Sequence, residues 1–73
     1  MDAIHPKHYE RGGMTCADAM RAMMHGQDVT NQEAYWWGCA LKYLWRWKEK
    51  NGTEDLQKAR ECIRLLIEET ERD

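Results

Sequence analysis

The sequence predicts an all-α protein, in which an N-terminal arm and a short helix precede an antiparallel hairpin of two longer helices. Apolar residues recur at helical spacing in three segments, and glycines separate these segments. No segment alternates apolar and polar residues as a half-buried strand does, and β-branched residues are few. We therefore place the arm at 1–13 and a single three-helix domain at 14–73, with helices at about 15–25, 31–51 and 54–71.

The arm has no apolar periodicity, contains Pro6, the only proline of the chain, and ends in a pair of glycines. These residues favour an irregular segment. Thr15, followed three residues later by Asp18, is a variant of the capping box that begins many helices. We therefore expect the first helix to start near Thr15 and to end at Gly26.

The second helix begins with a regular capping box, Thr30 and Glu33, and meets no helix breaker before residues 51–52. Gly38 lies inside this helix, where a glycine costs about 1 kcal/mol relative to alanine. Such a glycine often marks the close approach of another backbone or of a ligand, and a glycine without a role fits equally well.

The turn after the second helix contains Gly52, which suits the left-handed conformation that closes many helices. We expect Thr53 to cap the third helix, with Glu54 and Asp55 in its first turn, where negative charge is favoured. The third helix has the most regular apolar stripe of the chain: Leu56, Ala59, Ile63, Leu66 and Ile67.

Length and composition predict the oligomeric state, the location and the state of the cysteines. A chain of 73 residues buries only about 60% of the surface that its unfolded form exposes, so we expect a homo-oligomer to supply further burial. No apolar run approaches the ~20 residues of a membrane span, and the N-terminus lacks an apolar signal-peptide core, so we expect a cytoplasmic protein without a membrane partner. The cysteines are odd in number and widely spaced, which indicates reduced thiols: Cys16, Cys39 and Cys62.

Positive charge and aromatic surface coincide in the middle of the chain. Residues 30–52 carry four basic and two acidic side chains, whereas acidic residues outnumber basic ones on both sides of this segment. The same segment holds all four tryptophans: Trp36, Trp37, Trp45 and Trp47. This segment is therefore the first candidate for a functional site.

The second helix has two apolar faces, more than a three-helix chain can easily bury. One face is expected to pack against Leu56, Ile63 and Leu66 of the third helix, and consists of Trp37, Ala40, Leu41 and Leu44. The adjacent face consists of Trp36, Cys39, Tyr43 and Trp47. This second face fits either an interface with another copy of the chain or the stacking of a base.

The second helix also has a basic edge at spacing i, i+4 and i+8: Lys42, Arg46 and Lys50. Such an edge, next to the rings of Tyr43 and Trp45, can hold a nucleotide phosphate beside a stacked base. A solvated edge with salt bridges to Glu54 or Asp55 across the turn fits the same spacing. The segment is short and the chain is acidic overall, so we do not expect it to bind duplex nucleic acid.

The arm carries a second group of chemically active residues, His5, His8 and Tyr9. The two imidazoles could contact phosphate or exchange protons near pH 7. No Cys/His pair at zinc spacing completes a metal site with them, so we assign no metal. An arm pinned by Pro6 and Tyr9 against a neighbouring helix is the structural alternative.

Several motifs resemble a small family of tailed-phage proteins that is catalogued as a domain of unknown function and often described as phage nucleotide kinase-like. The resemblance rests on HPxHY at residues 5–9, the glycine pair after it, LKYLWR at residues 41–46 and KNGxEDLxKA at residues 50–59. It implies a phage protein of deoxynucleotide metabolism, acting in the host-cell cytoplasm. It also implies an oligomer, and phosphorylation of deoxynucleoside monophosphates without a P-loop. The motif positions that carry over are His5, His8, Tyr9, Lys42, Tyr43, Arg46, Lys50, Asn51 and Asp55.

Two departures bear on that implication. Trp47 stands where the family commonly has tyrosine or phenylalanine, and the chain is little more than the shared domain. The second departure favours binding over catalysis, because parts of a complete catalytic site could lie outside this domain.

The resulting hypothesis is a nucleotide site formed by the second helix, the following turn around Asn51 and the arm. Basic residues Lys42, Arg46 and Lys50 would hold phosphates, Tyr43 or Trp45 would stack the base, and His5 and His8 would close the site or move a proton. A kinase would take a nucleoside triphosphate as donor; the sequence assigns no other cofactor and leaves a Mg²⁺ requirement open. The alternative is a non-enzymatic phage effector that sequesters a nucleotide signal, or that binds a host protein through Trp36 and Trp47.

Overall fold

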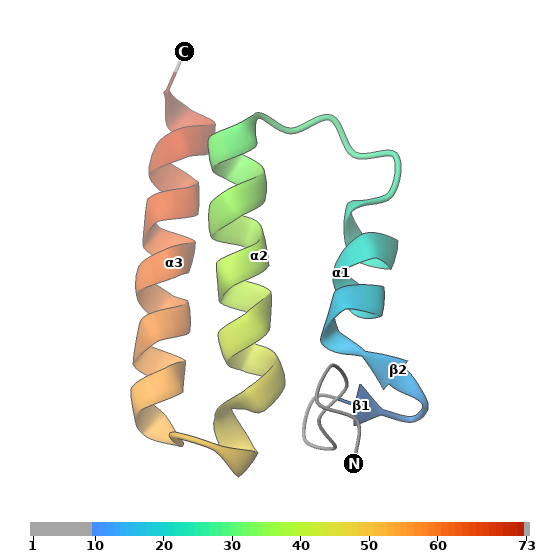
Figure 1. Cartoon of the computed structure of the whole chain (residues 1–73). Coiled ribbons are helices and arrows are strands. Elements are labelled where there is room, and N and C mark those ends of the chain that lie inside the picture. Colours follow the sequence, from blue (N-terminus) through green and yellow to red (C-terminus); the bar gives the residue numbers. More distant parts are fainter. Residues whose placement is uncertain (1–9, 73) are drawn as a thin grey trace.

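The computed structural model describes residues 10–72, so the predictions for His5, His8 and Tyr9 lie outside the described residues. The described residues are mostly helical, which confirms the all-α class (Figure 1). In chain order the elements are β1 (Glu10–Arg11), β2 (Met14–Thr15), α1 (Cys16–Met24), α2 (Asn31–Arg46), the 3₁₀ helix η2 (Trp47–Glu49) and α3 (Thr53–Glu71).

The two strands were not expected from the sequence. They pair antiparallel, with Arg11 opposite Met14, and are joined by Gly12 and Gly13. Both glycines have positive φ, 55° and 79°, as a two-residue hairpin turn of this kind requires. Strands of two residues are too short to show the alternation on which the sequence analysis relied, and the glycine pair is their only signal.

Both predicted capping boxes are present. At the start of α1, the Asp18 backbone N–H donates to the Thr15 hydroxyl at 3.0 Å, and the Thr15 N–H donates to the Asp18 carboxylate at 3.2 Å. Thr30 and Glu33 make the corresponding pair of bonds at the start of α2, at 3.1 and 2.8 Å. These bonds satisfy N–H groups that have no partner inside a helix, and so fix where each helix begins.

The end of α2 differs from the expectation. The α-helix ends at Arg46 and tightens into η2, instead of continuing to residue 51. Gly52 has the expected positive φ, 60°, and its N–H donates to the Trp47 carbonyl at 2.7 Å. Because this sharp turn leads directly into α3, the cap position falls on Gly52; Thr53 is the first helical residue and is not the cap.

The central helix α2 lies between α1 and α3 (Figure 1). It packs along α3, which runs in the opposite direction, and the turn at residues 50–52 joins the two at one end. Gly38 marks the approach of α1, because a Cβ at this position would lie only 3.3 Å from Met20 Sδ. Nearby, the Trp37 indole N–H donates to Met23 Sδ at 3.0 Å, so Trp37 is directed to α1.

The face of α2 that meets α3 differs in part from the predicted one, although Ala40 is buried as expected. Cys39 and Tyr43, assigned to the adjacent face, contact the Cys62 thiol and the Lys58 ammonium of α3. Leu44, which was expected to be part of the interface, is 46% exposed. Because α2 packs against α1 on one side and α3 on another, its Leu44 side chain lies on the flank between these two contacts.

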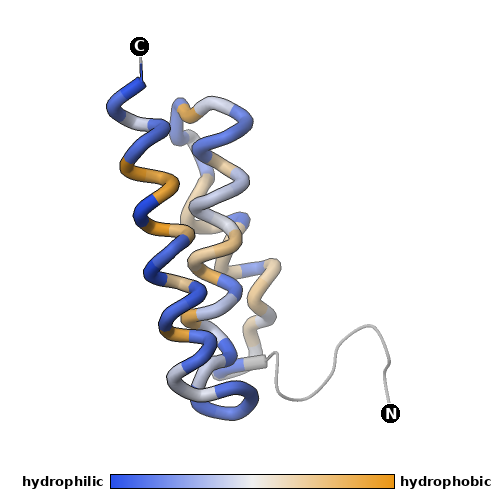
Figure 2. Tube along the Cα trace, turned by 90° about the vertical axis from the view of Figure 1, so that its left-hand side faces the viewer, coloured by the Kyte–Doolittle hydropathy of each residue, from blue (hydrophilic) through white to orange (hydrophobic). Residues whose placement is uncertain are grey.

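Burial is correspondingly limited. In the part of the chain that the structure describes, the buried apolar side chains are small: Ala40, Ala59 and Cys62. Apolar positions on α3 recur among strongly hydrophilic ones (Figure 2), and Ile63 and Ile67 are 42% and 50% exposed. No helix within residues 10–72 combines the length and the apolar character needed to cross a membrane.

Candidate functional site

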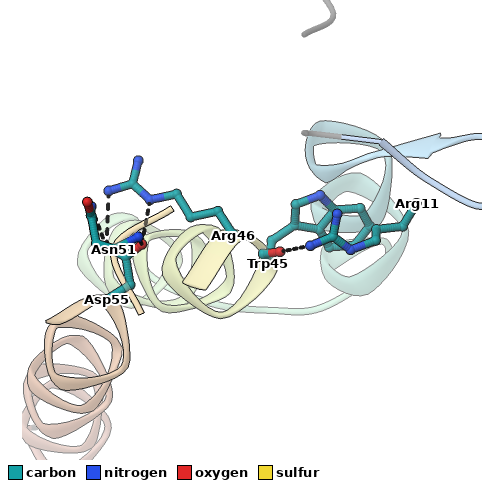
Figure 3. Close-up of polar contacts among 5 residues, drawn as sticks. All are labelled: Arg11, Trp45, Arg46, Asn51 and Asp55. Carbon is teal, nitrogen blue, oxygen red and sulfur yellow. Dashed lines mark hydrogen bonds and ion pairs between the residues drawn. The ribbon is translucent and has the colours of Figure 1, made fainter. Parts of the chain in front are cut away.

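A buried carboxylate organises the turn between α2 and α3 (Figure 3). Asp55 is 0% exposed, and the Nε and Nη2 atoms of Arg46 donate to its two oxygens at 3.2 and 3.3 Å. Asn51 adds a bond from its side-chain amide at 3.2 Å and one from its backbone N–H at 3.4 Å. The first turn of α3 is therefore attached to the end of α2.

The ionisation of Asp55 reflects two opposing influences. Burial raises the pKa of this carboxyl, because a low-polarity surrounding disfavours the charged form. Hydrogen bonds from Asn51 and Arg46, together with the Arg46 charge, outweigh burial and hold the pKa of Asp55 below its ordinary value. Asp55 is therefore a carboxylate at neutral pH and a firm partner for Arg46.

This arrangement decides what Arg46 can do. The sequence left open whether Arg46 holds a ligand phosphate or forms a salt bridge across the turn. In the structure its side chain is only 14% exposed, and two of its nitrogens donate to Asp55. Arg46 thus has a structural ion pair, and its positive charge still lies beside the aromatic ring described next.

Three cations surround the ring of Tyr43. The Arg46 Cζ lies 5.0 Å from the ring centroid, the Lys42 Nζ 5.1 Å and the Lys58 Nζ 5.7 Å. Each is within the ~6 Å at which a cation is attracted by the face of an aromatic ring. We call these four residues, Lys42, Tyr43, Arg46 and Lys58, the Tyr43 cluster.

Lys58 was absent from the predicted site. It comes from α3, and it reaches Tyr43 because both helices extend away from the same turn. Asp55 faces Arg46. Lys58 lies three residues after Asp55 on α3 and Tyr43 lies three residues before Arg46 on α2, so the Lys58 side chain meets the Tyr43 ring. If the salt bridge between Arg46 and Asp55 had been assumed, it would have fixed the register of α2 against α3. That register would have predicted Lys58 beside Tyr43 from the sequence.

Trp45 has a different environment. Arg11, in β1, donates from Nη2 to the Trp45 carbonyl at 2.7 Å, and its guanidinium lies 5.7 Å from the Trp45 ring centroid (Figure 3). Arg11 also pairs with Glu49 at 3.0 Å. Carbonyls in the last turn of a helix lack partners within the helix, and Arg11 supplies one. Trp45 is thereby part of the contact between the β-hairpin and α2.

The remaining predicted residues do not join the Tyr43 cluster. Lys50 is exposed just before Asn51, whose side chain is engaged by Asp55. Trp36 and Trp47, which the host-protein alternative takes as exposed, are half-buried. Within residues 10–72, no group of three or more histidine, cysteine or acidic side chains is placed to hold a metal ion.

One hollow on the described surface is remote from these residues. Its volume is about 480 Å³, and it lies along the outer side of α3 beside Gln57, Arg60, Glu61 and Arg64. Arg64 pairs there with Glu61 at 2.8 Å and with Glu68 at 2.6 Å. Its charge is thus already neutralised, so the Tyr43 cluster is the better candidate site.

The fold and site define a small all-α protein with a cation-rich aromatic cluster where two opposed helices meet. The chain belongs to the family described as a protein of unknown function, DUF3310, whose model matches residues 4–64. The match includes the Tyr43 cluster and its Asp55 support. Neither the curated proteins nor the solved structures contain a match to this chain.

Proposed function

We propose that this chain is a phage protein that binds the phosphate groups of a nucleotide at the Tyr43 cluster. The observation that carries the proposal is the convergence of three cations from two helices on one aromatic ring, at 5.0 to 5.7 Å. Like charges repel one another, so such a gathering is most favourable when an anion lies among them.

The charge balance of the cluster supports this proposal. Arg46 is paired with Asp55, whereas within residues 10–72 neither Lys42 nor Lys58 forms an ion pair with a carboxylate. Both lysines are exposed, so a ligand can reach them from solvent. Lysine ammonium groups sit on flexible side chains, so two of them near one ring can pair with different oxygens of the same phosphate group.

The resemblance to phage nucleotide kinases favours a deoxynucleoside monophosphate as the ligand. Phosphoryl transfer requires mainly positioning and neutralisation of charge, and a cation cluster contributes to both. A kinase would bind a nucleoside triphosphate as donor at the same time. Sequestration of a nucleotide would use the same cluster without turnover, so a phosphoryl-transfer assay separates the two forms of the proposal.

The test is a comparison of lysine variants. The double variant Lys42→Ala and Lys58→Ala should bind deoxynucleoside monophosphates and inorganic pyrophosphate about tenfold or more weakly, by titration calorimetry at low salt. Lys48→Ala is the matched control, because Lys48 also lies over an aromatic ring, Trp47 at 5.5 Å, and no second cation from residues 10–72 lies over that ring. Equal binding by the double variant and the control would refute the phosphate site.

We extend the proposal to a homo-oligomer assembled through one flank of the helix pair. Leu44 and Ile63 directly follow the interface residues Tyr43 and Cys62, and in opposed helices such positions lie on the same side. Ile67, one turn beyond Ile63, extends this exposed apolar flank along α3. A monomer that folds with so few large buried side chains gains stability by covering it.

Sedimentation measurements test the oligomer directly. The wild-type chain should sediment as more than a monomer at micromolar concentration, and Ile63→Glu should shift it towards the monomer, because a charge is costly to bury. Gln57→Glu, a new charge on the exposed side of α3, is the control and should leave the distribution unchanged. A wild-type monomer would disprove this part of the proposal.

A further inference from the structure

An apolar groove lies between α1 and α2, next to the Tyr43 cluster. Its volume is about 260 Å³, and it is lined by Met20, Ala34, Tyr35, Gly38, Cys39 and Lys42. The groove depends on Gly38, which has no side chain to fill it, and Met20 of α1 closes it from one side. Of the residues that line this groove, Lys42 alone belongs to the predicted site and to the proposed phosphate site.

Lys42 connects the groove to the cation cluster. Its side chain lines the groove, and its ammonium lies 5.1 Å from the Tyr43 ring centroid. The remaining lining is almost entirely apolar, so the positive charge is confined to one edge. A ligand that complements this surface has an apolar flat part and an anionic part joined to it.

The size of the groove restricts the apolar part. Pockets that enclose a whole drug-sized ligand have volumes of ~300–1,000 Å³. A groove of about 260 Å³ accommodates a single ring system and leaves a sugar and phosphate outside. The phosphate would then lie towards Lys42 and the Tyr43 cluster.

Tyr35 supplies the stacking surface. It is 62% exposed, the most exposed large apolar side chain among residues 10–72. Its ring packs edge-to-face against Trp36, with centroids 4.9 Å apart and an interplanar angle of 78°, which limits its freedom to rotate. An exposed aromatic ring with a restrained orientation favours stacking, because little conformational entropy is lost on binding.

We infer that the α1–α2 groove is a nucleobase subsite, in which Tyr35 stacks against the base of a nucleotide whose phosphate lies at Lys42 and Lys58. This inference rests on the proposed function. It moves the base from Tyr43 or Trp45, where the sequence analysis expected it, to Tyr35. The rings of Tyr43 and Trp45 lie beneath cations, whereas the Tyr35 ring borders an apolar space of the right size.

The experiment compares three probes on three proteins by titration calorimetry. The probes are the deoxynucleoside monophosphates, the corresponding deoxynucleosides and inorganic pyrophosphate. The proteins are the wild-type chain, Tyr35→Ala and the matched control Tyr35→Phe, which keeps the ring and removes only the hydroxyl. The exposure of Tyr35 makes both variants compatible with folding, and circular dichroism verifies this.

Tyr35→Ala should weaken monophosphate binding about tenfold, as expected for the loss of one base–aromatic stack, and leave pyrophosphate binding unchanged. Tyr35→Phe should bind like the wild type. Monophosphate binding that is unchanged in Tyr35→Ala but lost in the Lys42→Ala and Lys58→Ala double variant would overturn the base subsite and leave the phosphate site standing. No binding of any probe to the wild type would overturn both.

Discussion

Arg46 and Asp55 face each other across the turn between α2 and α3, with Nε and Nη2 of the guanidinium 3.2 and 3.3 Å from the two carboxylate oxygens. Planar groups paired in this way fix direction as well as distance. Because the carboxylate is fully buried, removal of either partner leaves the other without compensation in a poorly hydrated place. The pair therefore sets how the two helices leave the turn.

Loss of this pair should destabilise the fold strongly. Asp55→Ala leaves Arg46 and Asn51 without their acceptor, and should lower the melting temperature by on the order of 10 °C, followed by circular dichroism. Glu54→Ala, an exposed carboxylate in the same turn of α3, is the control and should change it little. Similar losses in the two variants would show that the buried pair has no special role.

The same pair predicts how stability depends on pH. The folded state holds the pKa of Asp55 below its ordinary value, so the unfolded chain takes up the proton first as the pH falls. The contribution of Asp55 is complete above its unfolded pKa of ~3.9 and is lost as the pH falls through the lower folded value. Urea unfolding between neutral and acidic pH should therefore show a steeper loss for the wild type than for Asp55→Asn. Parallel curves for the two proteins would contradict this account.

Any side chain at Gly52 should lower the stability of the fold. Its φ of 60° and ψ of −132° fall in a region that only glycine adopts readily, and no other atoms crowd the position. Gly52→Ala should lower the free energy of unfolding by about 1–3 kcal/mol through backbone strain alone. Gly38→Ala should have a smaller effect, because Gly38 is helical and the nearest atom belongs to the flexible Met20 side chain. The reverse order in chemical denaturation would disprove the strain argument.

The register of α2 and α3 predicts a specific disulfide. Tyr43 meets Lys58, and four residues further from the turn on each helix are Cys39 and Cys62, whose thiols interact. Burial, with a contribution from Cys39, raises the pKa of Cys62, so the bond should form faster at higher pH. Diamide should remove two electrons and two protons from these thiols, and peptide mapping should show a Cys39–Cys62 link. Cys62→Ser is the control, and a link through Cys16 in the wild type would contradict the register.

Local signals determined much of the fold. The capping boxes at Thr15 and Thr30 gave the helix starts, because their hydrogen bonds join residues three apart in the chain. The positive φ of Gly52 was likewise predictable from residue type. The face of α2 that meets α3 was not, because it depends on where α1 packs, and that depends on the missing side chain at Gly38.

The candidate site likewise contains residues that local spacing predicted and residues that only the packing of the elements revealed. Lys42, Tyr43 and Arg46 were found from spacing along one helix, since helical neighbours follow from sequence. Lys58 was missed because its contact with Tyr43 joins two helices, α3 and α2. The groove at Tyr35 was missed because it is formed between α1 and α2. The two possible roles of Arg46 could be weighed only when the burial of Asp55 was known.

The opposed directions of α2 and α3 also affect the far end of the molecule. The last turn of α3 contains acidic residues and no basic one, which by itself opposes the negative end of that helix dipole. However, this end of α3 lies beside the first turn of α2 (Figure 1), where backbone N–H groups make the field positive. The carboxylates that disfavour their own helix thus favour its neighbour, and the acidic end of α3 becomes favourable only when the two helices are together.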